Sequence, residues 1–362
     1  MISLNLSDLG GANKVAVTIA DELSKLGEDV NIVTLYKPNL QQIYRQWNID
    51  LSKIKISYLR IPFGLGKSMI FSHLIFYPFI TKIFNKYKPD QVIFNDDVSD
   101  PLNKINAKII QYNNLSFSLI LQHFPISISE IKREIYRKLF KRSKDADLII
   151  ANSSETAKCI RKSWNREDVK IIYPPVDTSR FRSRKRKENI VTVLARFLPY
   201  KNFEDAIKAC SLSKTKPKLY LIGFEDSRSY LKRLKKLVKE CGYEKNTYFF
   251  TNVYSNKVSK VLSKAKIVIH PCKVEPFGIA VVEAMSAGCV PIVYKSPWGP
   301  WYDIMDRGNY GLGYTTIDEL TAKIDEVMID ERKFEDLSRV SMERAKKFDT
   351  KIFREEIKKV LL

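Results

Sequence analysis

The sequence has few of the residues that usually build metal centres or covalent cross-links. It contains only three histidines and five cysteines in 362 residues. The cysteines stand apart with no C-x-x-C pair, so the sequence indicates neither a zinc site nor a disulfide framework. No cluster of histidine, cysteine and carboxylate has the spacing of a metal site. We therefore expect reduced thiols, which favour a cytoplasmic location, and no bound metal.

No hydrophobic run is long enough for a membrane span, which needs about 20 apolar residues. The most apolar segment, residues 70–80, is shorter and contains Pro78. It fits either a core element or a surface element that dips into a bilayer. The first residues lack the basic and apolar regions of a signal peptide and are interpreted as a strand. We expect a globular chain, and 362 residues suit about two domains.

Acidic residues are clearly outnumbered by basic ones. The chain has 41 Asp and Glu against 62 Lys and Arg, a formal net charge of +21. The basic residues concentrate at residues 131–145, 182–187 and 228–239. Such faces attract anionic membranes, nucleic acid or phosphorylated substrates, although a solvated lysine-rich surface is the simpler interpretation. Together with the apolar segment, they suggest the hypothesis of a peripheral contact with an anionic membrane.

Short apolar runs alternate with helical segments, as in α/β proteins with parallel sheets. Two prolines and a basic tract interrupt this alternation at residues 173–182, as a linker would. We predict two Rossmann-like domains facing across a cleft, at residues 1–178 and 179–348, and a terminal helix at 349–362. The predicted strands are 2–6, 30–35, 54–58, 91–95, 108–112 and 148–152, then 190–195, 218–222, 247–250, 267–270 and 290–294. The predicted helices include 12–26, 130–141, 203–211, 229–241, 255–265 and 278–287.

The most informative segment is residues 275–285, EPFGIAVVEAM. Glu275 and Glu283 are separated by seven residues, and an apolar run ending at Pro271 precedes them. A strand, a Pro/Gly loop and a helix in this order direct a helix N-terminus at a ligand. Unpaired N–H groups and a partial positive charge suit that end to phosphate or sugar oxygens. The spacing allows one carboxylate to bind a sugar and the other a ribose.

This segment resembles the motif E-x-F-G-x-x-x-x-E of retaining glycosyltransferases of family 4, which have the GT-B fold. The family continues with A-x-A-x-G-x-P-V, and here residues 284–293 read AMSAGCVPIV. Residues 171–177, IIYPPVD, are similar to the end of the family's first domain. The form with two prolines is most like enzymes that elongate lipid-linked mannose oligosaccharides, and their archaeal relatives. The resemblance covers nearly the whole chain.

The resemblance implies roles for several residues of the second half. Glu275 would bond the donor sugar hydroxyls, and Glu283 the ribose. Backbone N–H groups would hold the sugar or phosphate, and a residue after the strand at 247–250 would contact the base. The N–H groups are those of Phe277, Gly278 and Ile279, and the base contact is Val253.

Arg196 and Lys201 lie where a predicted strand runs into a loop and a helix. Ligands of open α/β sheets bind beyond the carboxyl ends of the strands. Cations at this position can neutralise a diphosphate whose charge grows as the glycosidic bond breaks. Taken alone they are two of sixty-two cations. The match to the family's R-x-x-x-x-K-N gives them the diphosphate-binding role.

The first half holds weaker candidates. Gly10 and Gly11 follow the first predicted strand and match the family's G-G-A, near the sugar and the acceptor. Glycines there permit close backbone approach. Many family members also have a histidine near the reacting carbon. Asn114 occupies that place here, and His123, in an H-F-P segment, is the alternative that we prefer.

Trp298 departs from the family, because it replaces one of two glycines in residues 296–304. The G-P-x-x-D-I form of this segment is again similar to the lipid-linked mannosyltransferases. Trp298 and Trp301 could stack on a sugar or an apolar acceptor, or could serve packing. Both interpretations stay open.

The sequence as a whole predicts a retaining transferase that moves a hexose from a nucleotide-sugar to a glycan or lipid-linked acceptor. Mannose from GDP-mannose is the first expectation for the donor, and a UDP-sugar is the second. We expect no metal, no other cofactor and no nucleic-acid partner, and a cytoplasmic protein. A non-catalytic sugar-binding protein and a nucleic-acid-binding protein are the alternatives. No usual nucleic-acid-binding signature is evident in the sequence.

Overall fold

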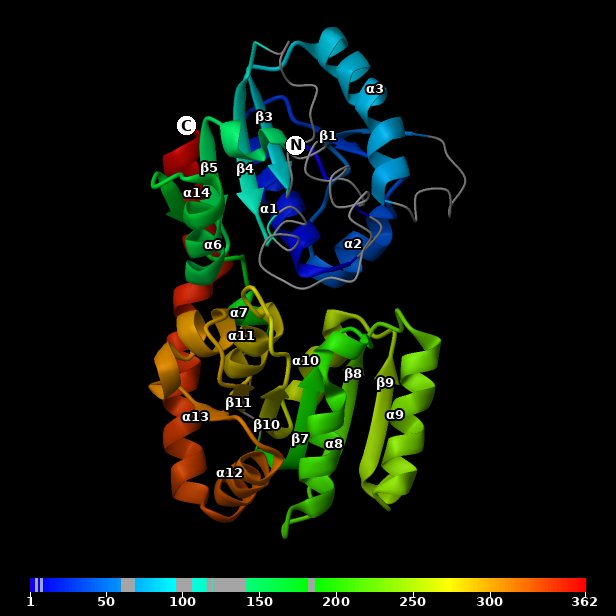
Figure 1. The fold of residues 1–362 in the computed structure, drawn as a ribbon, viewed down its shortest axis with the longest axis vertical. Coiled ribbons are helices and arrows are strands. Elements are labelled where there is room, and N and C mark those ends of the chain that lie inside the picture. The colour runs from blue at the N-terminus through cyan, green and yellow to red at the C-terminus, as the bar shows by residue number, and fades with distance from the viewer. Residues whose placement is uncertain are drawn as a thin grey trace. The chain divides into compact units, whose positions relative to one another are not determined.

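The computed structural model describes residues 1–3, 6, 9–59, 69–95, 106–115, 119, 141–181 and 186–362. The chain divides into two compact units. Unit 1 comprises Met1–Tyr173 and Arg354–Leu362, and unit 2 comprises Pro174–Phe353. Each unit contains a sheet of parallel strands flanked by helices (Figure 1).

The sheet of unit 1 is parallel wherever its described strands pair. A four-stranded part has the order β3-β4-β5-β6, and a separate pair joins β1 to β2. Ile2 bridges both Val33 and Phe94, so the first residues link the pair to the larger part. The strands are β1 (Asn31–Thr34), β2 (Lys55–Tyr58), β3 (Gln91–Asn95), β4 (Lys108–Asn113), β5 (Leu148–Ala151) and β6 (Val169–Ile171).

Helices of unit 1 contribute apolar side chains to its core. Ala16, Val17 and Ala20 of α1 pack in one core cluster with Ile43 and Trp47 of α2. The helices are α1 (Gly11–Lys25), α2 (Leu40–Trp47), α3 (Met69–Tyr87) and α6 (Ser154–Trp164).

The apolar segment at residues 70–80 forms part of α3. Its side chains Phe76 and Ile80 are buried with Val33 and Phe94 in a second core cluster. These two side chains therefore serve the core, which is one of the two interpretations drawn from the sequence. Among the described residues, no helix has both the length and the apolar character that crossing a membrane requires.

Unit 2 contains a six-stranded parallel sheet with the order β12-β11-β10-β7-β8-β9. The observed strands match the predicted ones to within a few residues, apart from β12, which the sequence did not indicate. A three-residue strand carries too short a pattern to be recognised. The strands are β7 (Glu188–Leu194), β8 (Lys218–Gly223), β9 (Thr247–Thr251), β10 (Ala265–His270), β11 (Val290–Tyr294) and β12 (Leu312–Tyr314).

Helices cover both faces of the second sheet. One core cluster joins the strands to α8, α9 and α12, and another joins them to α7, α10 and α11. In Figure 1, α9 accompanies β9 at the edge of the sheet. The helices are α7 (Thr178–Phe181), α8 (Phe203–Leu212), α9 (Arg228–Glu240), α10 (Ser255–Leu262), α11 (Ile279–Ser286), α12 (Ile317–Ile329) and α13 (Glu331–Ala345).

Helix α10 is shorter than the predicted helix at 255–265, because the last predicted residue instead opens a strand. Helix α10 ends at Leu262, and Ala265 begins β10. All six residues of β10 are buried. Burial in the centre of a sheet therefore outweighs the helical pattern at this position.

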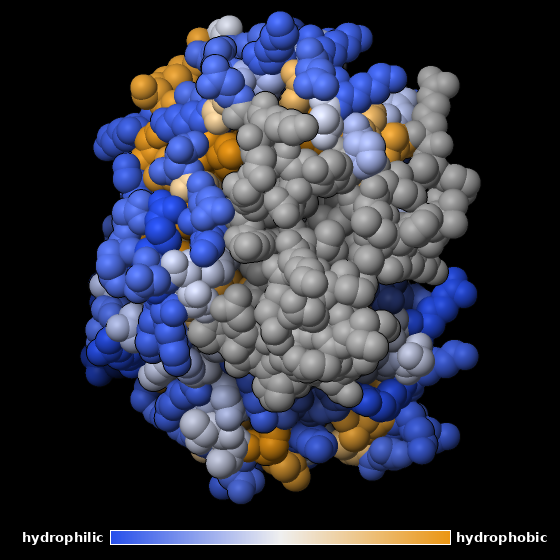
Figure 2. Space-filling view, turned by 45° about the horizontal axis from the view of Figure 1, so that its top comes forward, coloured by the Kyte–Doolittle hydropathy of each residue, from blue (hydrophilic) through white to orange (hydrophobic). Residues whose placement is uncertain are grey.

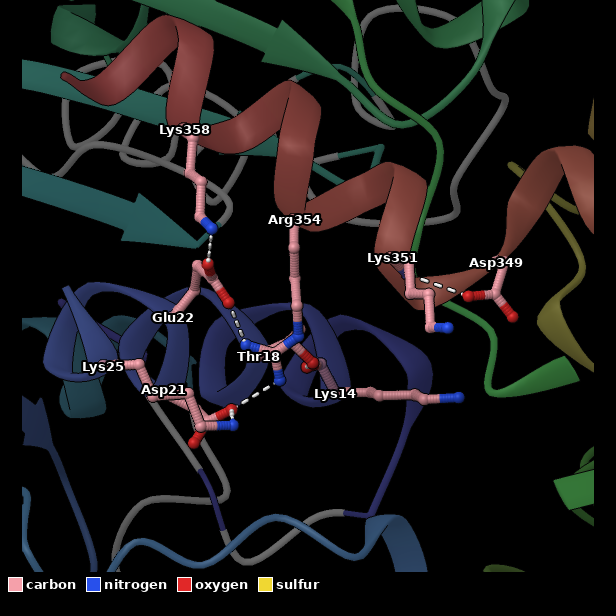
Figure 3. Close-up of polar contacts among 9 residues, drawn as sticks. All are labelled: Lys14, Thr18, Asp21, Glu22, Lys25, Asp349, Lys351, Arg354 and Lys358. Atoms are coloured by element: carbon pink, nitrogen blue, oxygen red, sulfur yellow. Dashed lines mark hydrogen bonds and ion pairs between the residues drawn. The ribbon is translucent and has the colours of Figure 1, made fainter. Parts of the chain in front are cut away.

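The last helix, α14 (Thr350–Leu361), starts in unit 2 and continues into unit 1. The Arg354 guanidinium contacts the carboxylates of Asp21 and Glu22 on α1, and Lys358 Nζ lies 2.7 Å from Glu22 Oε1 (Figure 3). The two acidic side chains are only 9% and 6% exposed. Burial alone would raise the pKa of Glu22, but Lys358 and Arg354 lower it below its usual value. The paired charges thus fasten α14 to α1.

Candidate functional site

The loop between β10 and α11 is the centre of the candidate site. Strand β10 ends at His270, Pro271 follows, and α11 begins at Ile279. Gly278 precedes the helix with a φ of 97°, a conformation that glycine adopts without strain. The predicted order of strand, loop and helix is therefore confirmed. The first N–H groups of α11 have no partner within the helix and can serve a ligand.

Glu275 projects from this loop and pairs with Lys201. Their Oε2 and Nζ atoms are 2.5 Å apart, and the side chains are 16% and 13% exposed. Burial alone would raise the pKa of Glu275, but the ammonium of Lys201 and His270 hold it well below its usual range. Burial alone would lower the pKa of Lys201, but Glu275 raises it above its usual value. Both groups are therefore charged at neutral pH.

Lys201 reaches this position because β7 and β10 are neighbouring strands. The loop after β7 ends at Asn202, which has a φ of 52° and donates from Nδ2 to Pro271 O at 3.4 Å. The Cys272 thiol lies 3.4 Å from Tyr200 O and 3.3 Å from Val274 O. These contacts hold the two loops together at the carboxyl edge of the sheet.

His270 and Cys272 lie beside Glu275. His270 is 4% exposed, and its Nε2 atom is 3.4 Å from Glu275 Oε2. One ligand atom from each of the three residues lies within 4.8 Å of the other two. The prediction that no cluster has metal-ligand spacing did not include this group, because H-x-C-x-x-E is an uncommon arrangement. The available signal was a histidine and a cysteine two residues apart at a strand end.

Arg196 follows β7 and pairs with Asp226, which follows β8. The distance from its Nη1 atom to Asp226 Oδ2 is 3.3 Å, and the two side chains are 36% and 33% exposed. A Cβ at Gly223, the last residue of β8, would lie 1.7 Å from Ala195 O. Glycine there lets the ends of β7 and β8 approach closely. Arg196 is held near the sheet edge while its guanidinium stays accessible.

The other candidates of unit 2 surround α11 or follow β9. Glu283 lies one turn into α11 and is half-buried, as is Val253 after β9. The ring of Phe277 is 2% exposed and packs edge-on against Phe348 at a centroid distance of 5.4 Å. Its side chain is therefore structural, which leaves only its backbone for a ligand.

The segment after β11 supports the same loop. A Cβ at Gly299 would lie 2.4 Å from Pro276 O, so only glycine fits. Trp298 is 6% exposed. The ring of Trp301 lies over Gly313, where a Cβ would approach its Cζ3 atom to 2.4 Å. Of the two interpretations of these tryptophans, the contacts favour packing within unit 2.

Unit 1 contributes fewer described candidates. Gly10 caps α1 with a φ of −75°, and Gly11 is the exposed first residue of that helix. The Gly10 conformation is open to any residue, so backbone strain does not explain this glycine. Asn114 donates from Nδ2 to Asn95 Oδ1 at 3.0 Å. His123 lies outside the described residues.

Two family models match the chain in succession. Residues 9–180 match the model described as Glycosyltransferase Family 4. Residues 176–347 match the model described as Glycosyl transferases group 1.

Several curated relatives carry the name GDP-Man:Man(3)GlcNAc(2)-PP-Dol alpha-1,2-mannosyltransferase. The Dictyostelium discoideum protein is 27% identical over 312 residues, which cover 79% of this chain and 58% of the relative. The Mus musculus protein is 33% identical over 178 residues, 44% of this chain and 36% of the relative. The chain thus spans less than two thirds of the length of these relatives.

Solved structures match along almost the whole chain. Sucrose-phosphate synthase of Thermosynechococcus elongatus has a TM-score of 0.82 at 17% identity, covering 99% of this chain and 96% of that one. Anabaena Alr3699/HepE in complex with UDP and glucose has a TM-score of 0.76 at 18% identity, covering 99% and 98%. WaaG, a glycosyltransferase involved in lipopolysaccharide biosynthesis, has a TM-score of 0.77 at 14% identity, covering 98% of this chain and 97% of that one. The chain belongs to glycosyltransferase family 4, a family of retaining transferases, and has the GT-B fold.

Proposed function

We propose that the protein transfers mannose from GDP-mannose to a glycan or lipid-linked acceptor, with retention of configuration. The observation that carries the proposal is the buried Lys201–Glu275 pair beside the N-terminus of α11. This arrangement offers a carboxylate, a cation and backbone N–H groups in one place, as a nucleotide-sugar requires. The choice of mannose, GDP and a lipid-linked acceptor rests on the name shared by the curated relatives.

Each residue of the site has a role in this reaction. Arg196 and Lys201 bind the diphosphate and stabilise the charge that grows on it as the sugar departs. Glu275 accepts hydrogen bonds from the donor sugar hydroxyls. The acceptor hydroxyl attacks the same face of the sugar, and its proton passes to the departing phosphate oxygen. No enzyme nucleophile is required.

The remaining predicted residues complete the donor and acceptor sites. Glu283 binds the ribose, and Val253 contacts the base. Backbone N–H groups of Phe277, Gly278 and Ile279 hold the sugar or phosphate. In unit 1, Gly10, Gly11 and either His123 or Asn114 serve the sugar and the acceptor.

The reaction is proposed to need no metal, because Arg196, Lys201 and the N-terminus of α11 can supply the positive charge that a diphosphate requires. The transfer rate should therefore not fall in EDTA. A rate that falls in EDTA and returns with Mg²⁺ or Mn²⁺ would contradict this part of the proposal.

The donor is the first point to test, since HepE, a structural neighbour, was solved with UDP and UDP-glucose. Thermal unfolding of the protein in excess GDP, UDP and ADP separates the candidates, because a ligand that binds only the folded state raises the melting temperature. GDP should give the largest rise. A rise with UDP alone would select a UDP-sugar as donor. No rise with any of them would favour the non-catalytic or nucleic-acid-binding alternatives.

We also propose that the protein works in the cytoplasm and contacts anionic membranes through its basic surface. Helix α9 supports this, because its apolar side is buried and its opposite side carries exposed cations. Lys232, Lys235 and Lys239 have no ion pair within the described part of the chain. On the face shown in Figure 2, most described residues are hydrophilic. A lipid-linked acceptor would require such a contact.

A further inference from the structure

His270, Cys272 and Glu275 form a group whose chemistry the transfer reaction does not fully use. His270 is the last residue of β10, and Cys272 follows two residues later. An imidazole nitrogen, a thiol sulfur and a carboxylate oxygen lie within 4.8 Å of one another. Nitrogen, sulfur and oxygen ligands together are the set that Zn²⁺ takes in proteins.

His270 supplies a second, independent observation. Its side chain is 4% exposed, and its Nε2 atom makes no hydrogen bond to any described residue. That atom faces Glu275 Oε2 at 3.4 Å without the geometry of a hydrogen bond. Buried polar nitrogens are nearly always satisfied, and one that is not requires an explanation such as an ion.

We propose that His270, Cys272 and Glu275 bind a soft divalent cation of the Zn²⁺ class. The bound cation would prevent the nucleotide-sugar from binding at the donor site. Zinc–ligand bonds of about 2.0 to 2.3 Å place the ligand atoms of a tetrahedral site about 3.3 to 3.6 Å apart. The three atoms, now within 4.8 Å, must therefore converge by about 1 Å. Side-chain rotation in the loop after β10 can supply this movement.

Binding changes the existing interactions of Cys272 and Glu275. The Cys272 S–H bond breaks, its proton passes to solvent, and a sulfur–metal bond forms in place of the thiol contacts to Tyr200 O and Val274 O. Lys201 Nζ, now 2.5 Å from Glu275 Oε2, must leave that carboxylate, because the metal ion takes its place. Lys201 therefore competes with the metal. Closure of the donor site rests on the proposed function, whereas metal binding does not.

The test measures metal binding directly on the full chain. Cd²⁺ bound to a thiolate gives an ultraviolet charge-transfer band, and calorimetry gives the Zn²⁺ affinity. Cys272→Ser should abolish the band and weaken Zn²⁺ binding by more than the 10- to 100-fold typical of outer-shell changes, on the order of 100-fold or more. Cys241→Ser is the matched control, since Cys241 is half-exposed and outside the group, and it should keep both signals.

Lys201→Met makes the test specific to this geometry. Removal of the competing cation should tighten Zn²⁺ binding at least about tenfold, the effect of a 1.4 kcal/mol difference. Two results would contradict the proposed metal site. One is a Cd²⁺ charge-transfer band that persists in Cys272→Ser, and the other is weaker Zn²⁺ binding in Lys201→Met. Cys272→Ala serves as a second variant, with metal-free thermal unfolding as the check on its fold.

Inhibition is measured separately from binding. Zn²⁺ should inhibit transfer by the native chain and not by Cys272→Ser. Tight Zn²⁺ binding without inhibition would overturn the closure of the donor site and would contradict the assignment of Glu275 and Lys201 to the donor. The same result would still support the metal site. Failure of the metal site and failure of the proposed donor site can therefore be distinguished.

Discussion

Glu275 and Lys201 stabilise each other as charged groups in a place where neither would stay charged alone. Their side chains are 16% and 13% exposed, so each loses much of its hydration. A buried charge without a partner is costly, and loss of one partner leaves the other uncompensated. The pair is therefore poised to exchange its internal contact for contacts to a charged ligand.

Lys201→Met and Glu275→Gln should each lower the transfer rate about 10²- to 10³-fold, the usual effect of losing one stabilising group in a transition state. Steady-state kinetics with GDP-mannose measures this. Lys351→Met and Glu335→Gln change exposed residues and provide matched controls. Rates near the native value in both site variants would refute the assignment.

The pH dependence follows from the lowered pKa of Glu275. A carboxylate whose folded pKa lies below its unfolded value of about 4.3 stabilises the fold above that value and loses this contribution as the pH falls. Glu275 therefore stays ionised from about pH 5 upward. If the transfer rate of the native chain falls between pH 7 and pH 5, the pH profile of Glu275→Gln should show a fall of the same shape. An acidic limb that disappears in this variant would contradict the prediction.

The sequence predicted which residues would bind the donor, but it did not predict which residues they contact. The motif around Glu275 predicted the loop, the helix and the acidic side chain at its mouth. It did not predict the contact with Lys201, 74 residues away in sequence. Such contacts depend on which strands are neighbours, and strand order is not written in local patterns.

Loop packing governs the site at the scale of elements. Gly299 lies against Pro276 and Phe277, where a Cβ would meet backbone atoms at 2.4 and 2.5 Å. The segment after β11 thereby holds the Glu275 loop in place. Positioning of this kind affects binding even though Gly299 itself offers no side chain.

Gly299→Ala should displace the Glu275 loop and weaken nucleotide binding at least about tenfold, in addition to a loss of about 1 to 3 kcal/mol of stability from overpacking. Calorimetric titration with GDP and chemical unfolding separate the two effects. Gly27→Ala is the control for nucleotide binding, because a Cβ at Gly27 would meet nothing within 4 Å, although its φ of 92° makes this substitution strained whereas Gly299 has a φ of −44°. Normal GDP affinity in Gly299→Ala would show that the loop does not depend on this contact.

The attachment of α14 to α1 is a second feature at this scale. Arg354→Met should lower the free energy of unfolding by about 2 to 3 kcal/mol, since Asp21 loses its guanidinium partner while it stays buried. Arg354→Lys should recover part of this loss, because it restores the charge without the planar fork. Thermal unfolding and amide exchange in α14 measure the effect. Lys351→Met, an exposed change on the same helix, should have none.

Element boundaries were predictable where the pattern is long. The central strands of unit 2 are continuous apolar runs, and α9 has its apolar residues at helical spacing. Strands β6 and β12 were missed because each has only three residues. Helix α10 was predicted too long because nothing in its local sequence marks the start of the buried strand.

The net charge of +21 is a property of the whole molecule. Its long-range field attracts anionic surfaces and is screened beyond about 10 Å at 0.1 M salt. Exposed cations on α9 extend this field from a regular helical face. The net charge follows directly from the sequence. It does not identify the anionic partner, because the field attracts any anionic surface.

Co-sedimentation with vesicles measures the proposed membrane contact. The protein should bind vesicles of anionic lipid and not neutral ones, with binding that falls as salt rises. Replacing Lys232, Lys235 and Lys239 together by Gln should weaken binding by about 3 kcal/mol, at about 1 kcal/mol for each cation near the surface. Filter binding to RNA and DNA is the comparison. Binding to nucleic acid alone would contradict the membrane proposal.

Chain order gives α14 a consequence for synthesis. Unit 1 includes both the first residues of the chain and those from Arg354 onward, whereas unit 2 is continuous in sequence. A ribosome therefore finishes every residue of unit 2 before it supplies Arg354 and the rest of α14. Until then Asp21 and Glu22 on α1 lack Arg354 and Lys358. Although unit 1 emerges first, it should reach its final stability after unit 2. In nascent chains stalled before residue 354, protease should therefore cleave unit 1 before unit 2.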